Sequence, residues 1–308
     1  MSARKDLYPG FAQHWIDTGR VTIYARVGGT GLPLLLLHGY PQTHVCWHKI
    51  APELARRFTL VIPDLRGYGA SSAPLGDAQH EVYSKRAMAE DCIALMRALG
   101  HVQFTAVGHD RGARVAYRLA LDHPEVLERL VILDILPTAE VWARMTWQSA
   151  IKSYHWSFLA QPAPIPETLI AAAPAVYVEH TLKSWTRAKS HDCFAPEALA
   201  HYRTMLDRPE RIHAVCEDYR AGATCDREAD EADRRAKRKI VCPTLVLWSS
   251  DYLVASKGAP DPLAVWREWA SDVEGREIVS GHFLAEENPE ATLAALLQFL
   301  DRTAEGCN

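Results

Sequence analysis

The pentapeptide Gly108-His-Asp-Arg-Gly112 stands between an apolar run that ends at Val107 and a helix-like stretch over residues 113–121. A strand, a tight glycine-bounded turn and a helix would expose Asp110 at the carboxyl end of the strand. The alternative is that Asp110 only caps the helix, which is a common place for aspartate. A carboxylate exposed at this turn is already anionic at neutral pH and can attack a carbon atom directly. The pentapeptide therefore predicts a strand–turn–helix unit that carries a candidate nucleophile.

Composition excludes several classes of protein. The 308 residues are 48% hydrophobic and 23% charged, which suits one or two globular domains, and the net charge of −4 leaves no general basic surface for nucleic acid. The longest apolar stretches, such as Leu32–Leu37, fall far short of the ~20 residues of a membrane span. The segment Met1–His14 lacks the apolar region of a secretory signal, and the 7 cysteines include no C-x-x-C pair. We therefore expect a cytoplasmic protein that binds neither nucleic acid nor a membrane.

Apolar strand-like runs alternate with helical stretches in both outer parts of the chain. Such alternation predicts an α/β fold with a mostly parallel sheet, helices on both faces and an antiparallel edge formed by the early strands. The segment after Pro137 is rich in Trp, Tyr, Pro and His, lacks a buried strand pattern and is expected to be an inserted helical cap. The expected domains are residues 1–137 as the first part of the core, 138–221 as the cap and 222–308 as the second part of the core.

Two other clusters are assigned structural roles. His44 and His48 are one helical turn apart with Cys46 between them, but no glutamate of an H-E-x-x-H motif accompanies them, so we expect no metal site. The run of both charge signs over Arg227–Lys239 is expected to be a solvated connecting helix rather than a nucleic-acid patch.

Six segments together resemble the haloacetate dehalogenases of the fluoroacetate dehalogenase type, within the α/β-hydrolase superfamily. The segments are His38-Gly-Tyr-Pro41, Gly108-His-Asp-Arg-Gly-Ala-Arg114, Leu133-Asp-Ile-Leu-Pro137, Tyr154-His-Trp-Ser157, Cys216-Glu-Asp-Tyr-Arg220 and Ser280-Gly-His-Phe283. The resemblance covers nearly the whole chain and implies the α/β-hydrolase fold, no cofactor, no metal and a homodimer formed through the cap.

The resemblance implies a catalytic triad in the order nucleophile, acid, base. Asp110 would be the nucleophile, and His282, which lies between the last strand and the last helix, would be the base. Two acids follow strands and could orient His282. Asp134 is favoured because it follows its strand immediately, and Asp251 is the alternative. The backbone N–H groups of Tyr40 and Arg111 would hold the oxyanion.

Two arginines beside the nucleophile indicate an anionic substrate. Arg111 and Arg114 are three positions apart and share one helical face, so their guanidinium groups can clamp a carboxylate that Asp110 would otherwise repel. The alternative is that one or both pair with acidic residues of the fold. Related haloalkane dehalogenases and epoxide hydrolases usually carry tryptophan after the aspartate.

The resemblance assigns the halide donors to His155, Trp156 and Tyr219 of the cap, which offer an imidazole N–H, an indole N–H and a phenol O–H. Composition alone would make them ordinary aromatic core residues, and Trp185 is a further pocket-wall candidate. Ala139 and Val141 depart from the family, which tends to carry bulkier aromatic residues there, and this leaves substrate size and halogen preference open.

We therefore expect hydrolysis of 2-haloacetates such as fluoroacetate and chloroacetate to glycolate and halide through an aspartyl ester. An epoxide hydrolase is the alternative enzyme, although it has little use for two arginines at the nucleophile. A non-catalytic receptor for a small acid is a third reading, but such receptors typically have a damaged triad, and this chain retains every element.

Overall fold

The computed structural model describes residues 6–254 and 260–301. Within them, 8 strands form one sheet in the order β1-β2-β4-β3-β5-β6-β7-β8. The pairs β1–β2 and β2–β4 are antiparallel, and the remaining pairs are parallel. The strands are β1 (Ala12–Asp17), β2 (Thr22–Gly28), β3 (Leu32–Leu37), β4 (Phe58–Pro63), β5 (Phe104–His109), β6 (Leu127–Leu133), β7 (Thr244–Ser249) and β8 (Val273–Ile278). The predicted parallel sheet with an antiparallel edge is confirmed.

Burial along each strand follows its place in the sheet. The last four residues of β3 and of β6 are completely buried, as expected for parallel strands that are covered on both faces. The edge strand β1 instead alternates exposed with half-buried side chains. The other edge strand, β8, is partly exposed along most of its length and therefore gives no apolar run in the sequence.

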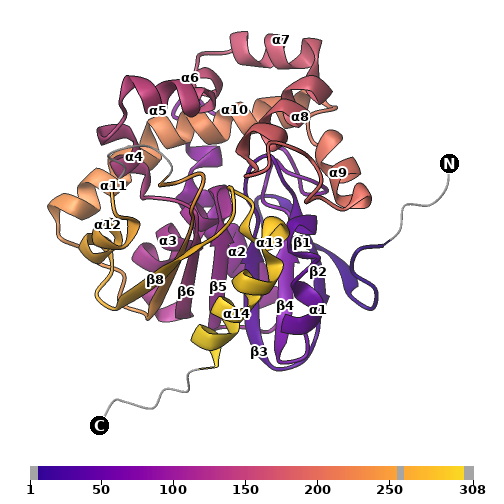
Figure 1. Cartoon of the computed structure of the whole chain (residues 1–308), viewed down its shortest axis with the longest axis vertical. Coiled ribbons are helices and arrows are strands. Elements are labelled where there is room, and N and C mark those ends of the chain that lie inside the picture. Colours follow the sequence, from indigo (N-terminus) through magenta and orange to yellow (C-terminus); the bar gives the residue numbers. More distant parts are fainter. Residues whose placement is uncertain (1–5, 255–259, 302–308) are drawn as a thin grey trace.

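Helices flank this sheet, and Figure 1 shows the sheet between them and below a second group of helices. The flanking helices are α1 (Ala51–Leu54), α2 (Lys85–Ala98), α3 (Arg111–Asp122), α12 (Pro262–Trp269), α13 (Leu284–Glu287) and α14 (Pro289–Leu300). Helix α3 packs on β5 and β6 and against α2. Across the described ranges, no helix has the length and apolar character needed to cross a bilayer.

Between β6 and β7 the chain is helical and adds no strand to the sheet. Its helices are α4 (Thr138–Ala143), α5 (Trp147–Lys152), α6 (Tyr154–Leu159), α7 (Ile165–Ala172), α8 (Pro174–Trp185), α9 (Pro196–Arg203), α10 (Pro209–Ala223) and α11 (Cys225–Arg235). Helices α5 to α10 lie together above the sheet in Figure 1, and α10 contacts α6, α7 and α11. The word cap is used below for α4 to α10.

The expectation of a solvated helix over the mixed-charge run is wrong for one face of α11. Its residues Asp230 and Asp233 are buried, and their carboxylates lie 2.9 and 2.6 Å from the guanidinium nitrogens of Arg118 on α3. A run of both charge signs gives no sign of this, because the partner of the acidic face lies more than a hundred positions away in the sequence. This ion-paired face attaches α11 to the core.

Candidate active site

Asp110 occupies a strained turn at the carboxyl end of β5. Its backbone has φ 48° and ψ −116°, a conformation that L-residues rarely adopt and that persists at functional sites when the surroundings enforce it. The two glycines allow the turn to pack closely: a Cβ on Gly108 would lie 2.5 Å from the Cα of Ala113, and one on Gly112 would lie 2.3 Å from the carbonyl oxygen of His38. The predicted strand–turn–helix unit is therefore present, and Asp110 makes no side-chain capping bond to α3.

The loop after β3 brings a backbone donor to this carboxylate. The N–H of Tyr40 donates to Asp110 Oδ1 over 2.8 Å. Arg111 opens helix α3, so its own N–H has no acceptor within the helix and is available at the same turn. The structure thus brings together the two backbone groups that the sequence predicted beside the nucleophile.

His282 lies on the loop between β8 and α13, with one carboxylate near each ring nitrogen. Its Nε2 is 3.6 Å from Asp110 Oδ2, and its Nδ1 is 2.7 Å from Asp134 Oδ2. Burial acts to lower the pKa of His282, but hydrogen bonding to Asp110 and Asp134 and their negative charges outweigh it and raise the pKa to about 9. The imidazole is therefore protonated at neutral pH.

The geometry separates the two candidate acids. Asp134 is buried at the end of β6, and its Oδ1 accepts from the N–H of Ser249 over 2.8 Å and from the Ser249 hydroxyl over 2.6 Å. Asp251 instead pairs with Arg187 over 2.7 Å on the surface, where its side chain is 43% exposed. Asp134 is the acid that contacts His282. Ser249, which orients Asp134, was missed by sequence reasoning because a serine at a strand end carries no signal of its own.

Both predicted clamp arginines are buried, and each keeps an unpaired nitrogen. The Nε and Nη2 of Arg111 donate to the Asp218 carboxylate over 3.0 and 2.6 Å, and the Nη1 of Arg114 donates to the carbonyl of Leu136 and the hydroxyl of Thr138, both over 3.0 Å. Arg111 Nη1 and Arg114 Nε have no hydrogen-bond partner among the described residues. Buried N–H groups of a cation without an acceptor are costly, so this pair is suited to an anion.

The clamp and the predicted halide donors form one cluster. The guanidinium of Arg111 lies 4.3 Å from the ring centre of Tyr219, and that of Arg114 lies 4.6 Å from the ring of Trp156. The ring of His155 lies 5.7 Å from that of Tyr219. All three aromatic residues are buried, so the cap presents its donors directly beside the arginines.

Two of these donors have no partner in the described part of the chain, namely His155 Nδ1 and the hydroxyl of Tyr219. Burial is the largest cause that lowers the pKa of His155, to about 3, so this ring is neutral at neutral pH and keeps one N–H to donate. Burial raises the pKa of the Tyr219 hydroxyl, which keeps its proton as well. Donors of this kind can stabilise a small anion as its charge develops.

Trp185 packs against His282. Its ring lies edge-on to the ring of His282, with 5.3 Å between the ring centres, and its ring centre lies 4.5 Å from that of His155. The backbone carbonyl oxygen of Trp185 accepts a hydrogen bond from the backbone N–H of His282 over 2.9 Å. The ring of Tyr252, which sequence reasoning did not single out, lies 4.4 Å from His282. His282 is thus enclosed by aromatic rings from the cap and from the loop after β7.

His44 contacts a buried acid of the core. Its Nδ1 and its backbone N–H both bond to the buried carboxylate of Asp64 over 2.8 Å, which is a structural contact. Among the described residues there is no group of three or more His, Cys, Asp or Glu side chains arranged to hold a metal ion.

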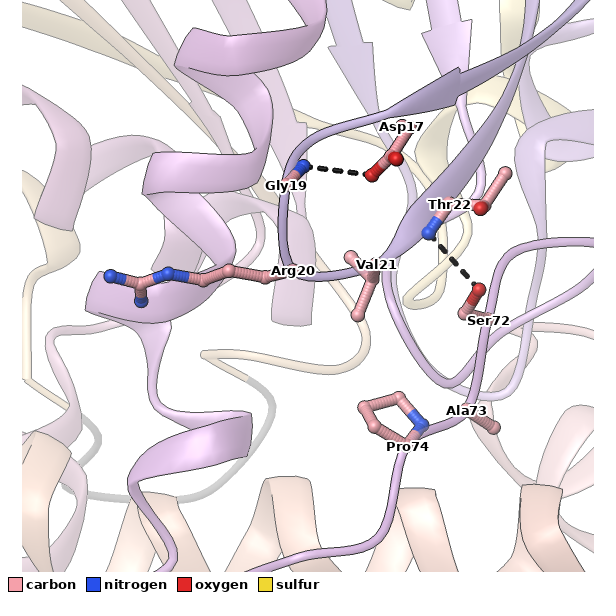
Figure 2. Close-up of a pocket in the computed structure, with 8 residues that line it drawn as sticks. All are labelled: Asp17, Gly19, Arg20, Val21, Thr22, Ser72, Ala73 and Pro74. Carbon is pink, nitrogen blue, oxygen red and sulfur yellow. Dashed lines mark hydrogen bonds between the residues drawn. The ribbon is translucent and has the colours of Figure 1, made fainter.

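A hollow of about 350 Å³ lies elsewhere on the surface, at the β1–β2 turn (Figure 2). Its polar groups bond to one another: the N–H of Gly19 donates to Asp17 over 2.8 Å, and the N–H of Thr22 donates to Ser72 over 3.0 Å. None of its lining residues belongs to the cluster around Asp110. This hollow is therefore separate from the candidate active site.

A mostly parallel sheet with a nucleophile turn, a histidine and an acid at its strand ends defines an α/β hydrolase. The sequence profile of the alpha/beta hydrolase fold matches residues 33–289, and the chain belongs to this family of enzymes.

Individual proteins are similar to the chain over nearly its whole length. The chain is 42% identical to the fluoroacetate dehalogenase of Burkholderia sp over 300 residues, which cover 97% of each chain, and the predicted resemblance to that type is confirmed. It is 32% identical to the soluble epoxide hydrolase of Corynebacterium sp. (strain C12), with 94% of each chain covered. A solved α/β-hydrolase structure from Nostoc sp PCC 7120 has a TM-score of 0.91 at 50% identity and covers 95% of this chain and 99% of its own.

Proposed function

We propose that this protein hydrolyses 2-haloacetates to glycolate, halide and a proton. The observation that carries the proposal is a pair of unpaired N–H groups, Arg111 Nη1 and Arg114 Nε, on two buried arginines whose charges interact with that of Asp110. A substrate that places its carboxylate on this pair is attracted to a site that would otherwise repel an anion. The identity to the Burkholderia fluoroacetate dehalogenase supports the same substrate class.

In the first step, a carboxylate oxygen of Asp110 attacks the carbon that bears the halogen. A carbon–oxygen bond forms as the carbon–halogen bond breaks, and the halide leaves with the bonding electrons. The N–H and O–H groups of His155, Trp156 and Tyr219 stabilise the departing halide. The other carboxylate oxygen stays on the N–H of Tyr40, as in the resting enzyme.

In the second step, His282 activates water to attack the Asp110 carboxyl carbon. Esterification removes the negative charge of Asp110, which is one of the causes that hold the pKa of His282 at about 9. The pKa of His282 therefore falls in the ester, so the ring can lose its proton and act as the base. Asp134 stabilises the imidazolium that forms when water gives up a proton, and the N–H groups of Tyr40 and Arg111 hold the oxyanion. Collapse of this intermediate breaks the bond between the Asp110 carboxyl carbon and the substrate oxygen, which takes a proton from His282 as glycolate leaves. The Asp110 carboxyl group then gives its remaining proton to His282 and is a carboxylate again.

Halide and glycolate release tests the proposal. Purified enzyme is incubated with fluoroacetate, chloroacetate and bromoacetate, and each product is quantified against an Asp110→Asn control. We expect equal amounts of halide and glycolate from at least one haloacetate, and no release from any of the three contradicts the proposal.

Epoxide hydrolysis is the second candidate because of the 32% identity to the Corynebacterium epoxide hydrolase. Epoxide opening by an aspartate needs a cap hydroxyl that donates to the epoxide oxygen, and Tyr219 is a hydroxyl of this kind. A neutral epoxide leaves the arginine N–H groups without an acceptor, which is why we favour the haloacetate. Diol formation from a neutral epoxide, with no halide release from haloacetates, would reverse this preference.

We also propose a homodimer formed through the cap. Several large apolar side chains of α5, α7 and α8 are exposed, namely Trp147, Ile151, Ile165, Leu169 and Val176. Exposed apolar surface of this kind is typical of an interface. The mass of the native protein by light scattering checks this, and a monomer at micromolar concentration contradicts it.

A further inference from the structure

Asp218 lies on cap helix α10, directly before Tyr219, and contacts more cations than a structural ion pair needs. Its carboxylate is fully buried and accepts from Arg111 Nε and Nη2, from the Tyr68 hydroxyl over 2.7 Å and from the ammonium group of Lys85. Its backbone carbonyl accepts a further bond from Arg111 Nη2 over 2.6 Å. Within the described part of the chain, this one cap residue therefore accepts all the hydrogen bonds of the Arg111 guanidinium.

These bonds determine which part of Arg111 faces the substrate. A guanidinium is a rigid planar fork, and a carboxylate that takes two of its nitrogens fixes both its position and its plane. Asp218 takes the edge formed by Nε and Nη2, so Nη1 is the nitrogen left unpaired. The ring of Tyr219 lies 4.3 Å from the same guanidinium and restricts its movement further.

The charge of Asp218 has the opposite effect on substrate binding. Burial acts to raise its pKa, but Arg111 and Lys85 lower it to about 2, so the carboxylate is ionised and reduces the attraction of Arg111 for another anion. Lys85 shares the Asp218 charge, and its ammonium group also lies 3.3 Å from Asp226. Loss of the Asp218 charge would thus increase the attraction of Arg111 for the substrate carboxylate, but it would also free the guanidinium to move. The net change in substrate affinity shows which of the two effects is larger.

We propose that Asp218 is a positioning residue for substrate recognition, which holds Arg111 so that Nη1 meets the substrate carboxylate. The inference rests on the proposed function and deepens it, because it makes the carboxylate clamp depend on the cap. Since Asp218 and Tyr219 are neighbours on α10, one helix then sets both the orientation of the clamp and the position of a halide donor.

The test uses Asp218→Asn, which keeps the size of the side chain and the backbone carbonyl but removes the paired charge. The matched control is Glu217→Gln on the same helix, because Glu217 is also buried in an ion pair, with Arg220 over 2.9 Å, and its other described ion pair is with His80, outside the site. We expect Asp218→Asn to raise KM for chloroacetate roughly 10-fold with a smaller change in kcat, since slight misplacement of a binding group is costly. Glu217→Gln should leave both constants unchanged.

A crystal structure of Asp218→Asn supplies a readout that does not depend on turnover, and it should show Arg111 Nη1 displaced. If Asp218→Asn fails to fold, Tyr68→Phe replaces it, since it removes one donor to Asp218 and should raise KM by a smaller factor. An unchanged or lowered KM with Arg111 in place means that Asp218 only balances charge and overturns the proposal. Equal losses in Asp218→Asn and Glu217→Gln mean a merely structural role and overturn it too.

The proposed function can fail separately. If the wild-type enzyme releases no halide from any haloacetate, that proposal is wrong, and the position of Arg111 Nη1 together with the affinity for acetate, measured by calorimetry in wild type and Asp218→Asn, still decides the role of Asp218.

Discussion

The strand-end half of the site and the cap half are built in different ways. Asp110, Asp134 and His282 each follow a strand of one sheet, so the sheet itself brings them together. The cap residues of the site come from helices α6 and α10, which meet the core through contacts with the ring of Tyr40 and through the buried ion pairs of Asp218; these residues are His155, Trp156, Asp218 and Tyr219. In the proposed mechanism, the strand ends supply the reactive groups, and the cap supplies groups that recognise the substrate and its leaving group.

The largest effect should come from the strand-end half. We expect Asp110→Asn to reduce halide release by more than roughly 10⁴-fold, because residues that act as one catalytic unit fail together when one is lost. His282→Asn should release at most one halide per site and then stop at the ester. Mass spectrometry of the peptide that contains Asp110 detects the ester, and intact mass confirms that the amide of the first variant has not hydrolysed. Wild-type turnover by His282→Asn would show that another group is the base.

The two acids should differ by a large factor. Asp134→Asn removes the carboxylate that bonds His282 Nδ1 and should slow ester hydrolysis by roughly 10²- to 10⁴-fold, whereas the surface pair of Asp251 predicts no change for Asp251→Asn. Rapid-quench measurement of ester decay compares them. The reverse ranking would assign the acid to Asp251.

Replacement of the clamp arginines should act mainly on binding. Arg111→Leu and Arg114→Leu each remove a charge-assisted bond to the substrate carboxylate, worth about 1.5–3 kcal/mol, so KM for chloroacetate should rise roughly 10- to 150-fold. The neutral chloroacetamide should lose much less. Both KM values staying at the wild-type level would rule out an anionic substrate at this position.

A smaller effect is expected when a single halide donor is removed. Trp156→Phe and Tyr219→Phe each delete one donor and keep most of the apolar wall, so activity should fall by roughly 10-fold on fluoroacetate and by less on chloroacetate and bromoacetate. Fluoride concentrates its charge most and therefore needs these bonds most. Equal losses with all three substrates would mean that the aromatic rings only shape the pocket.

The smallest effect is a shift in pKa. Because the Asp110 charge is one cause of the raised pKa of His282, Asp110→Asn should lower that pKa from about 9 towards its ordinary value. The wild-type imidazole is therefore protonated at pH 8, and the ring in the variant loses its proton at lower pH. Nuclear magnetic resonance of the His282 ring measures the pKa in the wild type and in the variant. Identical titrations would show that the Asp110 charge does not raise the pKa of His282.

Local pattern explains why the strand-end half could be predicted. The nucleophile turn, the strand before Asp134 and the loop of His282 each need only neighbouring residues to form, so their sequences show them. The cap donors were predicted by resemblance alone, since composition makes them ordinary core aromatics. The support of Arg111 could not be predicted, because Asp218 lies 107 positions further along the chain and a buried acid within a helix looks like any other.

The most direct test of the account follows oxygen in a single turnover. Excess enzyme is mixed with chloroacetate in water labelled with the heavy isotope of oxygen, and both products of the first turnover are analysed by mass spectrometry. If water attacks the Asp110 carboxyl carbon, the label enters the Asp110 side chain, and the hydroxyl of the released glycolate carries an unlabelled oxygen from the enzyme. Label in the glycolate hydroxyl with none in the peptide that contains Asp110 would mean direct displacement by water and would contradict the ester mechanism.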